Sequence, residues 1–126
     1  MTLCRQNFER PRLRAEWSII MEHVTILTEI VERVGVITLN YPPLNSVSKR
    51  MMAELMDALE TFEKDDVVRA VMLKSNGPDF SYGADGGDIT KNLNGATEEI
   101  SESFSVLGNR LVERIDCYPK PTLVAA

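Results

Sequence analysis

The 126-residue sequence predicts an α/β fold. Runs rich in β-branched residues occur over 24–31, 34–39 and 67–73, which is typical of strands. Apolar residues recur every three or four positions over 49–64 and again from residue 97, which is typical of amphipathic helices. A strand, a helix and a strand in succession favour a right-handed crossover between parallel strands. With 44% hydrophobic and 26% charged residues, the composition suits one globular domain.

The first two strands, over 24–31 and 34–39, are expected to form an antiparallel hairpin. Only Glu32 and Arg33 separate them, and two polar residues between strands are typical of a tight hairpin turn. Apolar and polar residues roughly alternate in the first strand, which predicts that one of its faces is buried.

An ordered loop is expected over 40–48, because Pro42 and Pro43 remove two backbone donors and force extended geometry. Ser48 ends this loop, and its hydroxyl can accept a hydrogen bond from the first turn of a helix over 49–64. The apolar stripe of that helix comprises Met51, Met52, Leu55, Met56, Leu59 and Phe62.

Charged residues are expected on the opposite face of this helix. Glu60 is predicted to pair with Lys64 one turn later, and Glu54 is assigned to the same solvated face. His23, the only histidine, precedes the first strand and is interpreted as a surface residue.

The second half of the chain continues the pattern with a mostly buried strand over 67–73. A second helix is predicted to begin near Thr97 and to stop at 118–121, where two prolines lie. A last strand over 122–126 is expected to be buried, and since neither a turn nor a cap follows it, the chain is interpreted as a fragment of a longer protein. The apolar face of the second helix comprises Ile100, Phe104, Leu107, Leu111 and Ile115.

Charge and composition exclude several classes of protein. Against 19 Asp and Glu there are 14 Lys and Arg, a formal charge of −5, which argues against a nucleic-acid-binding module. One histidine and two cysteines leave no Ser-His or Cys-His pair, no metal motif and no disulfide scaffold. No apolar run approaches the ~18 residues of a membrane span. We therefore expect a soluble protein with neither nucleic acid nor membrane as partner, cytoplasmic by default.

The N-terminal residues 1–22 are interpreted as a disordered or mis-started tail, and residues 23–126 as the folded domain. The tail is rich in arginine, as organelle-targeting peptides are, but it is neither rich in serine nor free of acidic residues. Targeting to an organelle is therefore left open.

A glycine cluster over 83–87 is the best candidate for chemistry. It matches neither the dinucleotide-binding nor the phosphate-loop glycine pattern, and it lacks the spaced acids of a calcium loop. Glycines let the backbone approach a ligand, and exposed amides in such a turn can donate to an anionic oxygen. From composition alone, a plain surface loop is the favoured interpretation.

Four blocks of sequence, in order and spacing, resemble the N-terminal half of the crotonase superfamily, the enoyl-CoA hydratase/isomerase family. The blocks are Gly35–Ser46, Val68–Leu73, Phe80–Asp85 and Pro119–Ala126. The resemblance covers residues 24–126 and implies an α/β fold of repeated ββα units in a spiral, here truncated. It also implies a parent protein that assembles as a homotrimer or homohexamer.

The resemblance implies that an acyl-CoA thioester binds with its carbonyl oxygen between two backbone amides, the first of which belongs to Ala84. Gly83 would supply the turn that aims this amide. Neither a permanently bound cofactor nor a metal is implied, since coenzyme A is part of the substrate. Lys49 is as readily a solvated lysine as a phosphate contact, and Tyr82 stands where many members have a small residue. The residues expected to line the coenzyme A cleft are Leu44, Ser46, Lys49, Tyr82, Gly83, Ala84, Asp85 and Gly86.

The second amide and the acid and base residues of the family are expected after Ala126, so the chain alone is expected to be inactive. Hydratase, isomerase and hydrolase therefore stay open, as does the acyl group. Two alternatives remain. The chain could be a non-catalytic binding or scaffold module, or the parent could be an acyl-CoA hydrolase of the superfamily.

Overall fold

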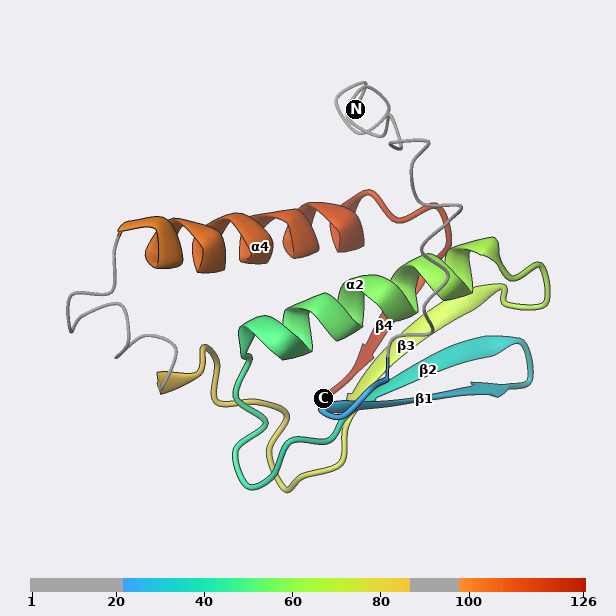
Figure 1. Ribbon diagram of the computed structural model, residues 1–126. Coiled ribbons are helices and arrows are strands. Elements are labelled where there is room, and N and C mark those ends of the chain that lie inside the picture. The colour runs from blue at the N-terminus through green and yellow to red at the C-terminus, as the bar shows by residue number, and fades with distance from the viewer. Residues whose placement is uncertain (1–21, 87–97) are drawn as a thin grey trace.

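The computed structural model describes residues 22–86 and 98–126. A four-stranded sheet of order β1-β2-β3-β4 lies beneath two helices (Figure 1). The predicted tail over 1–22 lies outside the described residues except for Glu22, and so does residue 97 at the expected start of the second helix. The elements are β1 (Ile26–Val31), β2 (Val34–Leu39), α2 (Lys49–Lys64), β3 (Ala70–Ser75), α4 (Glu98–Asp116) and β4 (Thr122–Ala125).

The sheet begins with the predicted hairpin. β1 and β2 are antiparallel, with Ile26 opposite Leu39, and the turn between them holds Glu32 and Arg33 at φ 48° and 68°. Positive φ at both central residues gives a turn whose twist matches that of the strands. β3 is parallel to β2 and β4 is parallel to β3, which confirms the crossover pairing that the order of elements predicts.

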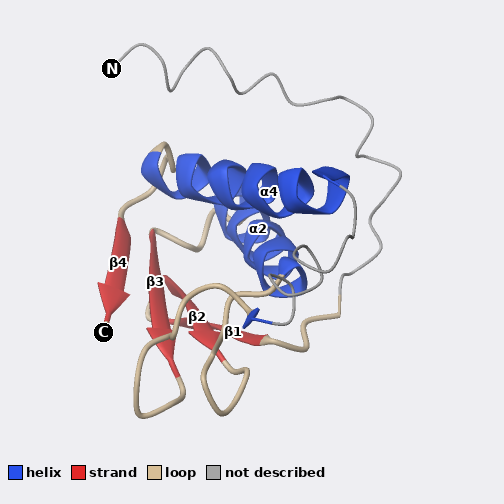
Figure 2. Cartoon of the chain, turned by 90° about the vertical axis from the view of Figure 1, so that its left-hand side faces the viewer, coloured by secondary structure: helices blue, strands red, loops and turns tan. Residues whose placement is uncertain are grey.

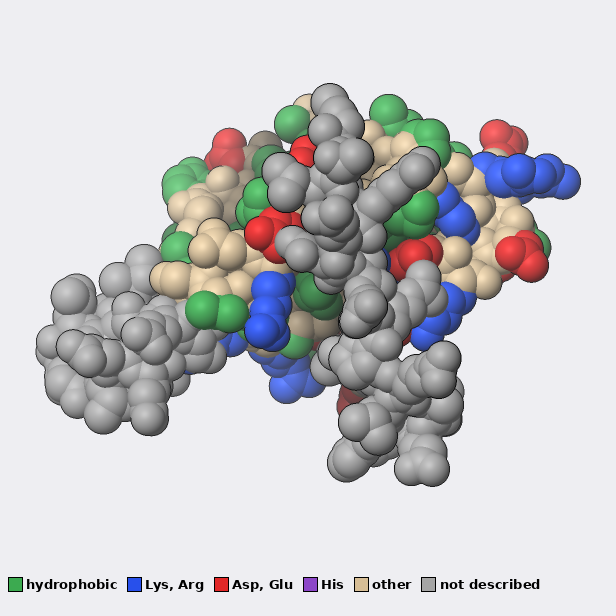
Figure 3. Space-filling model, turned by 90° about the horizontal axis from the view of Figure 1, so that it is seen from above, with side chains coloured by type: hydrophobic (Ala, Val, Ile, Leu, Met, Phe, Trp, Pro, Cys, Tyr) green, Lys and Arg blue, Asp and Glu red, His purple; other side chains and the backbone are tan. Residues whose placement is uncertain are grey.

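The layers are the sheet, then α2, then α4 (Figures 1 and 2). α2 contacts β1 and β2, while α4 packs on α2. The predicted bounds of α2 and its cap are confirmed, since the Ser48 hydroxyl accepts from the Met51 amide. Seen from the side of α4, hydrophobic, acidic and basic side chains are interspersed (Figure 3). The core cluster comprises Ile26, Ile37, Leu39, Met51, Met52, Leu55, Ala58, Leu59, Phe62, Val68, Val71 and Leu111.

α2 comes close to the sheet at Gly35. A Cβ built on Gly35 would lie 2.6 Å from Cδ2 of Phe62, closer than real Cβ atoms come to a neighbour. The missing side chain of Gly35 therefore makes room for the Phe62 ring, which is buried in the core.

The C-terminal end of α2 is held by the segment that joins α4 to β4. The Tyr118 hydroxyl donates to the Leu59 carbonyl over 2.6 Å, and the Lys120 ammonium donates to the carbonyls of Phe62 and Asp65. A cation on the last carbonyls of a helix stabilises its negative end. These contacts fix the direction in which the chain enters β4.

Two strands begin later than predicted, each because a side chain takes its amides. Val24 and Thr25 donate their backbone N–H groups to the Glu54 carboxylate, so β1 begins at Ile26 and not at 24. Asp65 accepts from the amide of Val67, so β3 begins at Ala70 and not at 67. Both differences arise from contacts that a strand pattern does not encode.

The predicted burial of both outer strands was wrong. In β1 only Ile26 is buried, and in β4 every residue is exposed. Both strands lie at the edges of the sheet, and the described helices stack over its centre. Among the helices of the described ranges, none is both long and apolar enough to cross a membrane.

Candidate functional site

Two loops that follow parallel strands meet at one end of the sheet. The first, over 40–48, follows β2, and the second, over 76–86, follows β3 (Figure 1). The carboxyl ends of parallel strands lie at the same edge of a sheet, so the loops that leave them are neighbours. These loops carry nearly all of the residues that the resemblance assigns to the coenzyme A cleft.

Asn45 organises both loops. It is 2% exposed and adopts φ 48°, a left-handed conformation that Asn tolerates better than most residues. Its Oδ1 accepts from the Tyr41 amide over 2.7 Å, and its Nδ2 donates to the Ser75 hydroxyl over 2.6 Å. The side chain thus closes its own loop and ties it to the end of β3. Sequence reasoning quoted Asn45 only as part of a motif and missed this role, although an Asn that follows two prolines is a recognisable turn signal.

Backbone hydrogen bonds join the two loops directly. The Tyr82 amide donates to the Leu44 carbonyl over 3.1 Å. The Val47 amide donates to the Gly83 carbonyl over 2.7 Å, and the Asp85 amide donates to the Val47 carbonyl over 2.9 Å. Val47 and Ala84 therefore form an isolated parallel bridge. The loops are held in fixed register although neither is a strand.

This bridge determines where the amide of Ala84 points. In a parallel bridge, one bridged residue, here Val47, makes both hydrogen bonds with the two residues that flank its partner, and the partner turns its own N–H and C=O to the other side. Ala84 is exposed, and no residue in the described part of the chain accepts a hydrogen bond from its N–H. A backbone donor therefore faces away from the Val47 side of the pair, open to a ligand.

Gly83 supplies the turn before this donor. Its φ is +88°, a conformation that L-residues rarely adopt, and its amide donates to the Ser81 hydroxyl over 3.1 Å. Nothing lies within 4 Å of a Cβ built on Gly83, so the glycine is needed for its backbone conformation and not for space.

The structure brings most of the predicted site residues together. Leu44 lies in hydrogen-bonded register with the segment 82–85, and Ser46 precedes the bridging residue Val47. Lys49 is the first residue of α2 and is half-buried. Gly86 is exposed at the far end of that loop.

Tyr82 has a large exposed ring at the rim of this arrangement. Its side chain is 63% exposed, and its hydroxyl donates to Oδ2 of Asp79 over 3.0 Å. This hydrogen bond, with the negative charge of Asp79, raises the pKa of the Tyr82 hydroxyl above its usual value. The ring is thus held at its polar end while its faces meet solvent.

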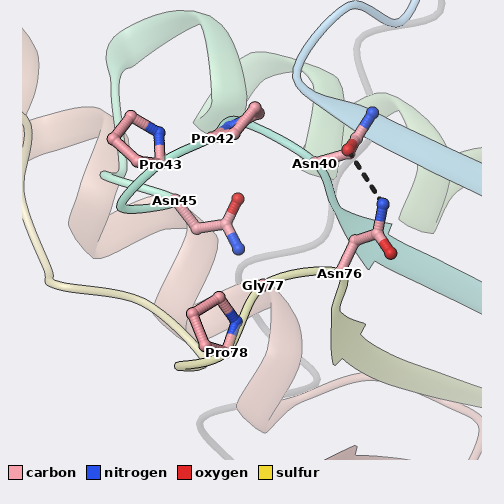
Figure 4. A pocket seen from close by; sticks show the side chains of 7 residues that line it. All are labelled: Asn40, Pro42, Pro43, Asn45, Asn76, Gly77 and Pro78. Carbon is pink, nitrogen blue, oxygen red and sulfur yellow. Dashed lines mark hydrogen bonds between the residues drawn. The ribbon is translucent and has the colours of Figure 1, made fainter.

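A separate pocket of about 250 Å³ lies on the same two loops (Figure 4). Within it, the Asn76 amide donates to Oδ1 of Asn40 over 3.1 Å. None of the residues predicted for the coenzyme A cleft lines it. The lining residues are Asn40, Pro42, Pro43, Asn45, Asn76, Gly77 and Pro78.

Two titratable residues lie elsewhere than sequence reasoning placed them. Glu54 was assigned to a solvated helix face, but it is 1% exposed and accepts from the amide and the hydroxyl of Thr25. His23 was interpreted as a surface residue, but it is half-buried and hydrogen-bonds to Asp57 over 2.8 Å. Both contacts join α2 to the chain that precedes β1 and take no part in the loop site. No cluster of three or more potential metal ligands occurs among the residues that the structure describes.

The chain matches the model of one protein family and is similar in sequence to curated proteins. The model of the enoyl-CoA hydratase/isomerase family matches residues 29–126. A probable enoyl-CoA hydratase of Bacillus subtilis is 38% identical over 92 residues, which is 73% of this chain and 34% of that protein. A 1,2-epoxyphenylacetyl-CoA isomerase of Escherichia coli is 34% identical over 101 residues, 79% of this chain and 38% of that protein. The chain thus spans between a third and two fifths of these relatives' length.

Solved structures share the fold. An enoyl-CoA hydratase/isomerase of Xanthobacter autotrophicus superimposes with a TM-score of 0.75 at 29% identity, over 83% of this chain and 39% of that one. An enoyl-CoA hydratase of Shewanella pealeana gives 0.75 at 25% identity, over 80% and 38%. These matches confirm the predicted crotonase-like α/β fold, of which the chain covers a part.

Proposed function

Because this chain belongs to the enoyl-CoA hydratase/isomerase family, we propose that it forms the acyl-CoA-binding part of an enzyme of that family. In this proposal the backbone N–H of Ala84 donates a hydrogen bond to the carbonyl oxygen of the bound thioester. The observation that carries it is the bridge between Val47 and Ala84, which leaves this amide exposed and without an acceptor in the described residues.

The chemistry of a thioester explains why a backbone amide suffices. When the carbon next to the carbonyl gains negative charge, or when a double bond conjugated to it is attacked, the charge collects on the carbonyl oxygen. A donor fixed toward that oxygen stabilises the charged transition state more than the neutral ground state. Loss of one such donor typically costs ~10²–10³ in rate. Ala84 contributes through its main chain, so its inert side chain is no obstacle.

The named relatives support a coenzyme A thioester as the substrate class. One is named an enoyl-CoA hydratase and the other an epoxyphenylacetyl-CoA isomerase, so the names differ in reaction but share the CoA thioester. We assign the shared part, thioester binding, to this chain. Coenzyme A would enter as part of the substrate and not as a resident cofactor.

Binding and turnover are proposed separately. The chain matches 34% and 38% of the length of the two curated relatives. Glu54, an acid that is buried, accepts hydrogen bonds from Thr25 and lies in the contact between α2 and the residues before β1. We therefore propose that the chain binds the thioester without hydrating or isomerising it, and that other parts of the whole protein supply the acid and base.

Calorimetric titration with two ligands tests the proposal. Crotonyl-CoA carries the thioester carbonyl, while the thioether S-crotyl-CoA has a methylene in its place and is otherwise matched. We expect crotonyl-CoA to bind more tightly, because only its carbonyl accepts from Ala84. Equal affinity for the two ligands would contradict the proposal that the Ala84 amide binds the thioester carbonyl. Hydration is measured as a loss of the enoyl absorbance. If the isolated chain hydrates crotonyl-CoA, the proposal that it binds the thioester without turning it over is contradicted.

A further inference from the structure

Tyr82 presents an aromatic ring that is fixed in place and yet uncovered. Its hydroxyl is tied to Asp79 at 3.0 Å, and its backbone amide is tied to the Leu44 carbonyl at 3.1 Å. Its side chain nevertheless remains 63% exposed. One hydrogen bond thus holds the backbone of Tyr82 and another holds the polar end of its ring, while the ring itself stays exposed.

The residue whose backbone pairs with Tyr82 carries an apolar side chain that is also exposed. Leu44, whose backbone pairs with Tyr82, is itself 46% exposed. Ala84, with its open amide, lies two residues further along the same segment. A ligand whose carbonyl oxygen meets the Ala84 N–H would therefore pass close to the ring of Tyr82.

We propose that Tyr82 is a specificity-determining residue, whose ring stacks on a planar ring of the bound acyl-CoA. This inference rests on the proposed function, because it requires a thioester at Ala84. Aromatic rings attract one another in offset stacks, and a ring that is already oriented loses little freedom when it stacks. A coenzyme A thioester offers two such rings, the adenine of the cofactor portion and an aromatic acyl group where one is present.

Asp79 has a positioning role in this arrangement. Its carboxylate accepts a hydrogen bond from the Tyr82 hydroxyl and so holds the polar end of the ring. The hydroxyl is thus occupied by a neighbour in the same loop. The face of the ring is therefore the part of the side chain that can contact a ligand. We expect Tyr82 to affect which ligands bind tightly.

Three variants separate these roles. Tyr82→Leu keeps an apolar side chain and removes the ring, while Tyr82→Phe keeps the ring and removes its anchor on Asp79. Tyr41→Leu is the matched control, because Tyr41 is an exposed tyrosine of the first loop whose hydrogen bonds within the described residues are made by its backbone amide and carbonyl and not by its side chain. Thermal melting of each variant verifies that it is folded.

The ligands are three thioesters, titrated by calorimetry. Crotonyl-CoA contains adenine, phenylacetyl-pantetheine contains an aromatic acyl group without adenine, and crotonyl-pantetheine contains neither ring. We expect Tyr82→Leu to weaken at least one ring-bearing ligand by about 5- to 30-fold, as loss of a stacking partner does. Crotonyl-pantetheine should bind equally to the wild type and the variant. Tyr82→Phe should keep most of the affinity and Tyr41→Leu all of it.

The pattern of losses identifies the ring. A loss with crotonyl-CoA alone assigns the stack to adenine, and a loss with phenylacetyl-pantetheine alone assigns it to the acyl group. An equal loss with all three ligands, or no loss with any, overturns the role of Tyr82 while the proposed function stands. If the wild-type chain binds none of the thioesters, the proposed function fails as well.

Discussion

The carboxylate of Glu54, inside α2, accepts hydrogen bonds from both the backbone amide and the hydroxyl of Thr25, a residue 29 positions earlier in the chain. Glu54 is 1% exposed, and it also contacts the Val24 amide and the Arg50 guanidinium. A buried carboxylate is tolerated when donors surround it. This contact ties the start of β1 to the helix that covers it.

Glu54→Gln tests how much this contact stabilises the fold. The amide has the same shape but offers one acceptor oxygen, and its NH₂ group would face backbone donors. We expect the free energy of unfolding to fall by about 1–3 kcal/mol, the cost of leaving buried polar groups unsatisfied. Urea denaturation measures it. Glu60→Gln is the control, since Glu60 forms a partly exposed pair with Lys64 and should change stability by less than about 0.5 kcal/mol.

Gly35→Ala tests the close approach of α2 to the sheet. The new Cβ would lie 2.6 Å from the Phe62 ring, which is buried in the core and has little room to move. Overpacking of this kind costs about 1–3 kcal/mol. In Gly108→Ala, by contrast, the Cβ on α4 would lie 3.7 Å from Sδ of Met52 on α2, an ordinary contact between the two helices. That variant should gain about 0.5–1 kcal/mol from helix propensity, and a loss there would contradict the packing described.

Stability should fall at high pH because of Tyr118. Burial, with a contribution from the Glu63 carboxylate, raises the pKa of the Tyr118 hydroxyl to about 12. Its value in the unfolded chain is about 10. The folded state thus holds this proton more tightly, so its contribution is complete below about pH 10 and is lost as the pH rises toward 12. Unfolding at several pH values should show this loss in the wild type and a smaller one in Tyr118→Phe.

Gly83→Ala tests the turn before the open amide. A side chain at φ +88° is strained even though space is available, and such strain costs about 1–3 kcal/mol. Gly86→Ala is the stability control, because its Cβ would also meet open space and the residue has no positive φ. Equal melting temperatures for the two variants would mean that the turn does not depend on the glycine.

Local patterns predicted the centre of the fold well. The bounds of α2 followed from the Ser48 cap and an apolar stripe, and β2 over 34–39 from its β-branched run. These signals lie within the element that they specify. The starts of β1 and β3 were predicted too early, because the contacts of Glu54 and Asp65 with backbone amides decide them.

The candidate site was predictable in its residues but not in its geometry. Resemblance pointed to the segment 82–86 and to Leu44, and the structure places Leu44 against this segment. The direction of the Ala84 amide depends on a bridge to Val47, a residue 37 positions earlier, and no spacing rule encodes it. The role of Asn45 depends in the same way on partners distant in sequence, Ser75 at the end of β3 and Phe80 in the second loop.

Amide hydrogen exchange at Ala84, followed by NMR, tests the central claim most directly. In the free chain we expect the Ala84 amide to exchange rapidly, while the amides of Val47 and Asp85, which bond across the bridge, are protected. Saturation with crotonyl-CoA should slow exchange at Ala84, because the thioester oxygen then accepts its hydrogen. Protection of Ala84 in the free chain, or unchanged exchange once the ligand is bound, would contradict the account.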